Sequence, residues 1–168
     1  MVEVDYVVHE INLDYSGILN LKELYDLIKS WFNERGFFVM EKESGGSEDE
    51  AESSFSTKFE TFKKVEEYTR YKIEISIKST SLKETSEQHN YKGNFSISFE
   101  SYLEKDYEDR YENKPLLKIF KGIHEKLVER GKFSKYESEL REYTYAIYNE
   151  VKAFLNLAKV WKEINLYT

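Results

Sequence analysis

The segment DYEDRYENKP, residues 106–115, concentrates side chains that could do chemistry. Asp106, Asp109 and Glu112 recur every three residues, so in a helix their carboxylates would lie on one side. Such oxygen ligands suit a hard cation such as calcium or magnesium. A calcium loop also needs a glycine turn and more oxygen ligands, and Arg110 offers these acids an ion-pair partner instead. We therefore prefer salt bridges at a strand-to-helix junction, with a metal site at the three acids as the alternative.

The same segment also has the composition of a protein-binding surface. Tyr102, Tyr107 and Tyr111 surround Arg110, and tyrosine and arginine are enriched where protein partners bury surface. The chain contains 14 tyrosines, so these rings could equally cover the rim of a core with their hydroxyls in water. These four residues are the predicted binding residues, and no catalytic residue is predicted.

Other motifs for catalysis or cofactor binding are missing from the sequence. His9, His89 and His124 lie far apart, and none has a second histidine at the spacing of a zinc-protease helix. The two adjacent glycines are flanked by acids that would repel a phosphate, and no serine stands at a glycine-flanked elbow. We expect no cofactor, and a non-enzymatic role is preferred over an enzymatic one.

The composition indicates a single folded domain over residues 1–168. The chain is 40% hydrophobic, 16% aromatic and 34% charged, which supplies both a core and a solvated surface. It contains no cysteine, and it shows neither a signal segment nor an apolar run long enough to span a membrane, which favours the cytoplasm. A net charge of −7 disfavours nucleic acid as a partner.

The pattern of apolar residues predicts a strand, a helix and then about four more strands. Residues 2–13 favour a strand that ends near Asp14 and Gly17, and Asn20 with Glu23 forms a helix-capping pair. The helix then continues to Gly36 with an apolar stripe of Leu21, Leu24, Leu27, Ile28, Trp31 and Phe32. The acidic, glycine- and serine-rich residues 44–54 predict a mobile loop. Alternating runs then place Phe55, Phe59, Tyr71, Ile73, Ile75, Ile77, Phe95, Ile97 and Phe99 on the buried faces of strands.

Two helices are expected after the strands. Pro115 suits a first helical turn, and an apolar stripe follows it as far as Gly131. A longer helix begins near Ser134, with a stripe of Tyr136, Leu140, Tyr143, Ile147, Val151, Phe154 and Ala158. The predicted fold is a two-layer α+β domain of order β-α-β-β-β-β-α-α, in which three helices cover one face of an antiparallel sheet of about five strands.

Three stretches, HEINLDYSGILNLKELYDLIKSWFNERGF, FESYLEKDYEDRYENKP and YNEVKAFLNL, resemble a group of small archaeal proteins of unassigned function. The resemblance implies a similar α+β fold and an archaeal source, but no activity. The long C-terminal helix and aromatic inner face are also similar to the helix-grip fold of START-like lipid- and polyketide-binding proteins. Such folds usually have more strands, and the extra C-terminal helix is a further departure.

Two functions from different classes follow. The first is a non-enzymatic protein-interaction or self-association module that uses the tyrosine-rich segment or an exposed sheet edge. The alternative is a binder of, or enzyme for, an apolar small molecule held between the sheet and the long C-terminal helix. The residues that motivate this alternative are Phe95, Phe99, Tyr143 and Phe154.

Overall fold

The computed structural model describes residues 3–44, 48–49, 52–67, 69–86, 89–105 and 129–165. Within these ranges the elements are β1 (Glu3–Asn20), α1 (Leu21–Glu34), β2 (Phe38–Ser44), β3 (Glu48–Asp49), β4 (Glu52–Lys64), β5 (Thr69–Glu84), β6 (Asn90–Lys105) and α3 (Glu129–Asn165). All strand pairs are antiparallel. The predicted α+β class with an antiparallel sheet is therefore confirmed.

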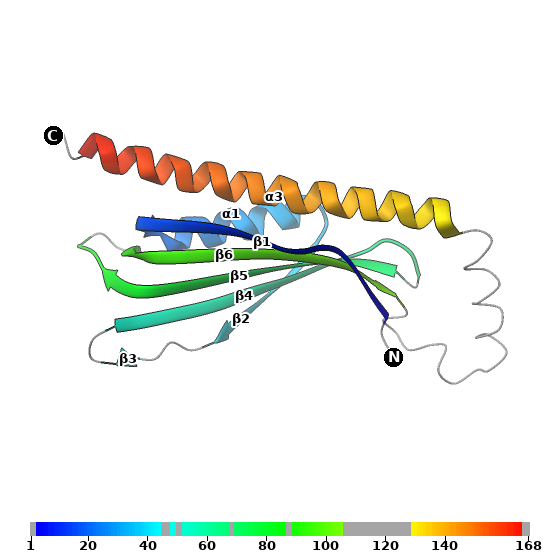
Figure 1. Ribbon diagram of the computed structural model, residues 1–168, viewed down its shortest axis with the longest axis horizontal. Coiled ribbons are helices and arrows are strands. Elements are labelled where there is room, and N and C mark those ends of the chain that lie inside the picture. The colour runs from blue at the N-terminus through cyan, green and yellow to red at the C-terminus, as the bar shows by residue number, and fades with distance from the viewer. Residues whose placement is uncertain are drawn as a thin grey trace.

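Five long strands form the sheet in the order β1-β6-β5-β4-β2, and the two-residue strand β3 pairs with β4. Strands β4, β5 and β6 are neighbours in both sequence and space, whereas β1 closes the sheet by pairing with the strand farthest from it along the chain. This order leaves β1 and β2 at the two edges. Figure 1 shows the five long strands side by side, with α3 running along the length of the sheet.

Helices α1 and α3 pack against each other and share one core with the sheet. The stripe of α1 buries Leu24, Ile28, Trp31 and Phe32. The sheet contributes the alternating residues expected from the sequence, including Phe59, Tyr71, Ile73, Ile75, Ile77, Phe95, Ile97 and Phe99. From α3 come Leu140, Thr144, Ile147, Val151 and Leu155. The face of the sheet that these residues occupy is called the inner face below.

The predicted count of three helices differs from the two found in the described ranges. The helix predicted from Pro115 falls mainly on residues 106–128, which lie outside the described residues. Its predicted end at Gly131 is wrong, because α3 passes from Glu129 through Gly131 and Ser134 without a break. An ideal Cβ at Gly131 would have no atom within 4 Å, so this glycine serves no packing need and the helix tolerates it.

Two boundaries differ from the sequence prediction because ladder pairing outweighs local turn signals. Strand β1 does not end near Asp14 and Gly17, since its pairing with β6 continues through Gly17 opposite Gly93 to Asn20 opposite Asn90. The predicted loop at 44–54 contains β3, and β4 already begins at Glu52. By contrast, the capping of α1 is confirmed, because the Glu23 amide donates to Asn20 Oδ1 over 3.0 Å.

Candidate functional site

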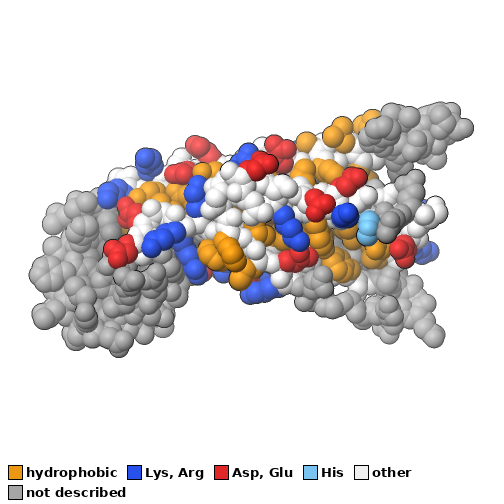
Figure 2. Space-filling view, turned by 180° about the vertical axis from the view of Figure 1, so that it is seen from behind, with side chains coloured by type: hydrophobic (Ala, Val, Ile, Leu, Met, Phe, Trp, Pro, Cys, Tyr) orange, Lys and Arg blue, Asp and Glu red, His pale blue; other side chains and the backbone are white. Residues whose placement is uncertain are grey.

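A pocket of about 400 Å³ lies on the inner side of the sheet, against the first three turns of α1. We call it the α1 pocket. Its apolar lining comes from α1 and three strands: Leu21, Tyr25, Phe55, Leu82 and Tyr91. Its charged or titratable lining is Lys22, Asp26, Lys29 and His89. Figure 2 views the molecule from behind, the side of α1, and shows apolar side chains reaching the surface among charged ones where α3 ends.

The floor of the α1 pocket depends on irregularities in two neighbouring strands. The β5–β6 register shifts between Thr80 and Lys83, where Ser81 adopts a left-handed φ of 56°. Strand β4 has a register shift at the same level, between Ser53 and Phe55. A bulge inserts one residue and reverses which side chains face inward after it. Before the bulge the odd-numbered residues of β5 face inward, and after it the even-numbered Leu82 does.

Gly93 on β6 accommodates the bulge of β5. An ideal Cβ at this position would lie 3.1 Å from the Thr80 carbonyl oxygen and 3.4 Å from Leu82 Cα. The contact with the carbonyl oxygen is tighter than ordinary van der Waals contact, so a side chain at position 93 would require the bulged strand to move by a few tenths of an ångström. Gly93 does not have a positive φ. Its lack of a side chain shapes the pocket because it lets the backbones of β5 and β6 lie close together.

The α1 wall of the pocket is fixed to the sheet by several contacts. The Leu21 amide donates to the His89 carbonyl over 3.2 Å, which joins the helix start to the β5–β6 turn. The Tyr25 ring meets Phe59 edge-on, with ring centroids 5.1 Å apart. Lys29 forms a 2.5 Å ion pair with Glu41 of β2. Helix, turn and edge strand thus hold the pocket walls in place.

Three groups at the mouth of the pocket have no such partners. The side chains of Lys22, Asp26 and His89 are exposed, and within the described ranges none of them makes an ion pair or a side-chain hydrogen bond. His89 sits in the turn predicted for it, with a left-handed φ of 65°. These side chains can therefore turn toward a ligand without breaking an interaction with any residue that the structure describes.

The opposite, outer face of the sheet carries a second cluster of charged residues. Glu74 and Glu104 are only 9% and 6% exposed, although the alternating pattern predicts position 74 on a polar, solvated face. Lys72 joins them, with Nζ 3.2 Å from Glu74 Oε1 and 3.5 Å from Glu104 Oε1. Arg70 bonds Glu104, and Lys58 lies 2.5 Å from Glu74. We call these residues the outer-face cluster.

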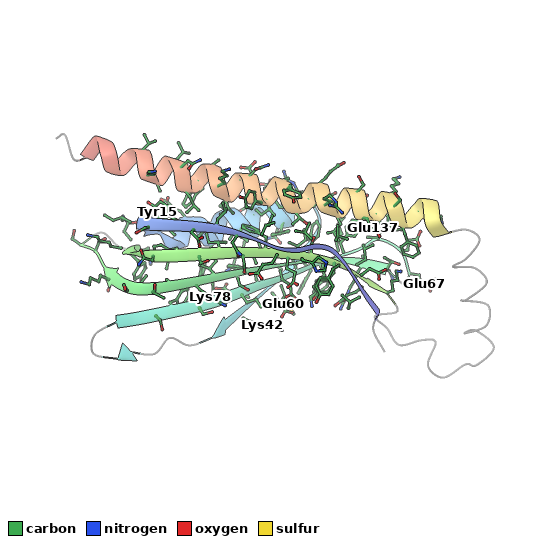
Figure 3. All side chains as sticks on the ribbon, viewed as in Figure 1. Tyr15, Lys42, Glu60, Glu67, Lys78 and Glu137 are labelled. Atoms are coloured by element: carbon green, nitrogen blue, oxygen red, sulfur yellow. The ribbon has the colours of Figure 1, made fainter. Side chains whose placement is uncertain are left out.

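Glu60 extends the outer-face cluster toward the edge of the sheet. Its carboxylate accepts a 2.7 Å hydrogen bond from Lys42 of β2, and Lys72 lies 3.8 Å from it. Figure 3 labels Lys42 and Glu60 next to each other, on the part of the sheet away from α3. The cluster therefore links four strands through side chains alone.

Protonation in the outer-face cluster is set by burial and hydrogen bonding. Burial alone would raise the pKa of Glu74, but bonds from Lys58, Tyr102 and Lys72 outweigh it and hold this pKa below its usual value. Burial would lower the pKa of Lys72, yet its contacts with Tyr102 and Glu74 raise the pKa instead. The pKa of Tyr102 is raised, first by burial and also by its bond to Glu74. At neutral pH the carboxylate and ammonium stay charged and the phenol stays neutral.

These shifts indicate a structural role for the outer-face cluster. A general acid or base works best with a pKa near the working pH, and here each pKa is moved away from neutrality. Within the part of the chain that the structure describes, no three His, Asp or Glu side chains are close enough together to hold a metal ion. The α1 pocket is therefore the better candidate for function.

The predicted binding residues are only partly within the structure. Tyr102 lies on the outer face at 8% exposure and donates a 2.7 Å hydrogen bond to Glu74. Its partners in the prediction, Tyr107, Arg110 and Tyr111, lie outside the described residues, as do the metal candidates Asp106, Asp109 and Glu112. The binding role of this tyrosine cluster stays a prediction.

The aromatic residues behind the small-molecule hypothesis belong to the core. Phe95 and Phe99 are 2% and 0% exposed, and Phe99 packs edge-on against Tyr148 of α3. Tyr143 and Phe154 are half-buried around the same core. Sequence reasoning missed the α1 pocket itself. The available signal was the segment STSLKE, where the alternation of the preceding strand residues breaks.

No family model, curated protein or solved structure matches this chain. No helix in the described ranges is both long and apolar enough to cross a membrane.

Proposed function

We propose that this protein binds a small amphipathic molecule in the α1 pocket. The observation that carries the proposal is the combination of an apolar floor with charged groups that lack partners in the described chain. Phe55, Leu82 and Tyr91 supply the floor from three adjacent strands. Binding sites for small molecules are typically concave and mostly apolar, with a few polar groups that orient the ligand.

The size and chemistry of the pocket narrow the ligand class. About 400 Å³ lies toward the lower end of the usual range for ligand sites, roughly 300–1,000 Å³. An apolar or aromatic body would lie over Leu82 and Tyr91, and a polar group would meet Lys22, Asp26 or His89 at the mouth. A purely apolar ligand would leave those polar groups without a partner.

The arrangement of a long C-terminal helix across an antiparallel sheet supports the analogy with helix-grip, START-like binding proteins. The proposed site nevertheless differs from the sequence-based hypothesis in its position. It lies against α1, whereas Phe95, Phe99, Tyr143 and Phe154 belong to the core that the sheet shares with α3. The proposal concerns binding, and no reaction is assigned.

Titration with the anionic amphipathic dye 1-anilinonaphthalene-8-sulfonate tests the proposal. The variant Leu82→Trp adds volume to the floor and should weaken dye binding by about tenfold, a typical effect of blocking a well-packed contact. The matched control is Leu157→Trp, because Leu157 is an apolar α3 residue at 60% exposure that does not line the pocket. Circular dichroism establishes that both variants fold. Equal dye affinity in the two variants would rule out the α1 pocket as the binding site.

A further inference from the structure

Three charged side chains of α1 form a rim along one side of the α1 pocket. Lys22, Asp26 and Lys29 line the pocket and follow one another at spacings of four and three residues, so they lie on a single face of the helix. We call them the α1 rim. Their charges alternate in sign along the helix. Asp26 therefore has a lysine on either side of it, each at a spacing that permits an ion pair.

The structure pairs Asp26 with neither lysine. Lys29 turns to the sheet instead, where its Nζ lies 2.5 Å from Glu41 Oε2 and 6.0 Å from the centroid of the Tyr25 ring. Within the described ranges, Lys22 and Asp26 take part in no ion pair. Lysine before aspartate is also the less favourable order for a pair four residues apart on a helix. The α1 rim thus keeps one cation and one anion uncompensated, one helical turn apart.

We propose that the ligand of the α1 pocket is a zwitterion, an aromatic amino acid in its chemical class. This inference rests on the proposed function and deepens it. The ligand's carboxylate lies at the start of α1, against Lys22 and the imidazole of His89, because the Leu21 amide holds the His89 backbone at that end of the helix. The ligand's ammonium lies one turn further along, against Asp26. Its aromatic body lies over the apolar floor.

Ligands with a single charge fit the α1 rim less well. The carboxylate of a simple acid would meet Lys22 but would also lie near Asp26, where like charges repel. The ammonium of a simple amine would meet Asp26 but would lie near Lys22. In both cases one group of the rim stays without a partner. A zwitterion gives each group an opposite charge, and complementarity of this kind is what confers specificity on a binding site.

Three indole compounds that differ in one charged group test the proposal. L-Tryptophan carries both groups, indole-3-propionate lacks the ammonium and tryptamine lacks the carboxylate. Calorimetric titration of the full chain should give L-tryptophan the highest affinity, by about threefold to tenfold over each of the others, as expected for charge-assisted contacts at a partly exposed site. Equal affinities, tighter binding of either singly charged compound, or no binding of L-tryptophan would overturn the proposal.

Variants that remove one charge identify which residue meets which group. Asp26→Asn should lower the affinity for L-tryptophan to that for indole-3-propionate, and Lys22→Gln should lower it to that for tryptamine. The matched control is Glu23→Gln, because Glu23 is an exposed acid of the same helix that does not line the pocket. This control should keep the full preference for L-tryptophan. A preference that survived both Asp26→Asn and Lys22→Gln would overturn the assignment to the α1 rim.

The dye titration separates this inference from the proposed function. If Leu82→Trp weakens dye binding but the wild type shows no preference for L-tryptophan, the pocket binds ligands and only the zwitterion assignment fails. If Leu82→Trp changes neither dye binding nor L-tryptophan binding, both proposals fail together.

Discussion

The charged side chains of the outer-face cluster and those at the mouth of the α1 pocket differ in burial and in ion pairing. In the outer-face cluster, Glu74 and Glu104 are almost fully buried and bonded to Lys72 and its neighbours. At the mouth of the α1 pocket, Lys22 and Asp26 are exposed and have no ion pair within the described ranges.

The difference shows which charged residues hold the fold together and which are available for binding. A buried charged group that loses its partner carries a desolvation cost, so the outer-face residues constrain one another. The pocket residues can change partners at little cost to the fold. We therefore assign the outer-face ion pairs to the stability of the fold, and the binding proposal rests on the groups at the pocket mouth that have no partner within the described ranges.

The largest expected effect is on the outer face. Glu74→Ala leaves Lys58, Lys72 and the Tyr102 hydroxyl without their shared acceptor and should lower the free energy of unfolding by about 2–3 kcal/mol. Asp26→Ala in the pocket should change it by less than about 0.5 kcal/mol. Urea denaturation measures both values. Similar losses in the two variants would remove the distinction between the faces.

Gly93 provides a way to alter the pocket through the backbone. Gly93→Val should displace the β5 bulge, lower the free energy of unfolding by about 1–3 kcal/mol and weaken dye binding. Gly131→Ala is the matched control, because a Cβ there meets nothing within 4 Å and the residue lies within α3. That control should be more stable by about 0.5–1 kcal/mol. Unchanged dye affinity in Gly93→Val would show that the bulge does not shape the site.

Two threonines extend the comparison to neutral buried groups. The Thr57 hydroxyl is buried and has no hydrogen-bond partner among the described residues, whereas the Thr61 hydroxyl donates to the Ile73 carbonyl over 2.9 Å. Thr57→Val should raise the free energy of unfolding by about 1 kcal/mol, and Thr61→Val should lower it by a similar amount. Thermal denaturation followed by circular dichroism compares them. A loss of stability in Thr57→Val would mean that its hydroxyl is satisfied.

The smallest effect concerns acid stability. The pKa of Glu74 in the folded protein lies below its ordinary value of 4.5. Its ionised carboxylate therefore adds to the free energy of unfolding above pH 4.5, and this added stability is lost as pH falls through the lower folded pKa. Glu74→Gln should therefore flatten the decline of stability below about pH 5. The pKa of Glu100 is raised, first by burial and then by repulsion from Glu74. Protonation of Glu100 therefore stabilises the folded protein as pH falls. Glu100→Gln removes this gain and should steepen the same decline of stability. Changes of the same sign in the two variants, measured by urea denaturation across pH, would contradict these assignments.

Local patterns were enough to predict most of the elements. The capping pair of Asn20 and Glu23, with the stripe to Phe32, defined α1 because helix ends and amphipathic faces are encoded in neighbouring residues. The alternation from Tyr71 to Ile77 likewise identified the inner face of β5. Wrong boundaries occurred at Gly17 and Gly131, where pairing with β6 and continuation of α3 override the local preference of glycine.

Contacts between distant segments could not be predicted in the same way. The α1 pocket needs Phe55, Leu82, His89 and Tyr91 at one end of the sheet, beside residues of α1 more than 25 positions earlier in the chain. The burial of Glu74 likewise depends on Lys58 and Tyr102, which lie on the two strands that flank it.

The sequence by itself determined the one-sided sheet, the cap and stripe of α1 and the packing face of α3, because these depend on periodicity over a few turns or a few strand residues. Tertiary structure decided the strand order, the bulged floor beside Gly93 and the division of charged residues into partnered and partnerless ones. Those features depend on which backbones lie side by side, and strand register is settled only when the whole inner face is buried at once.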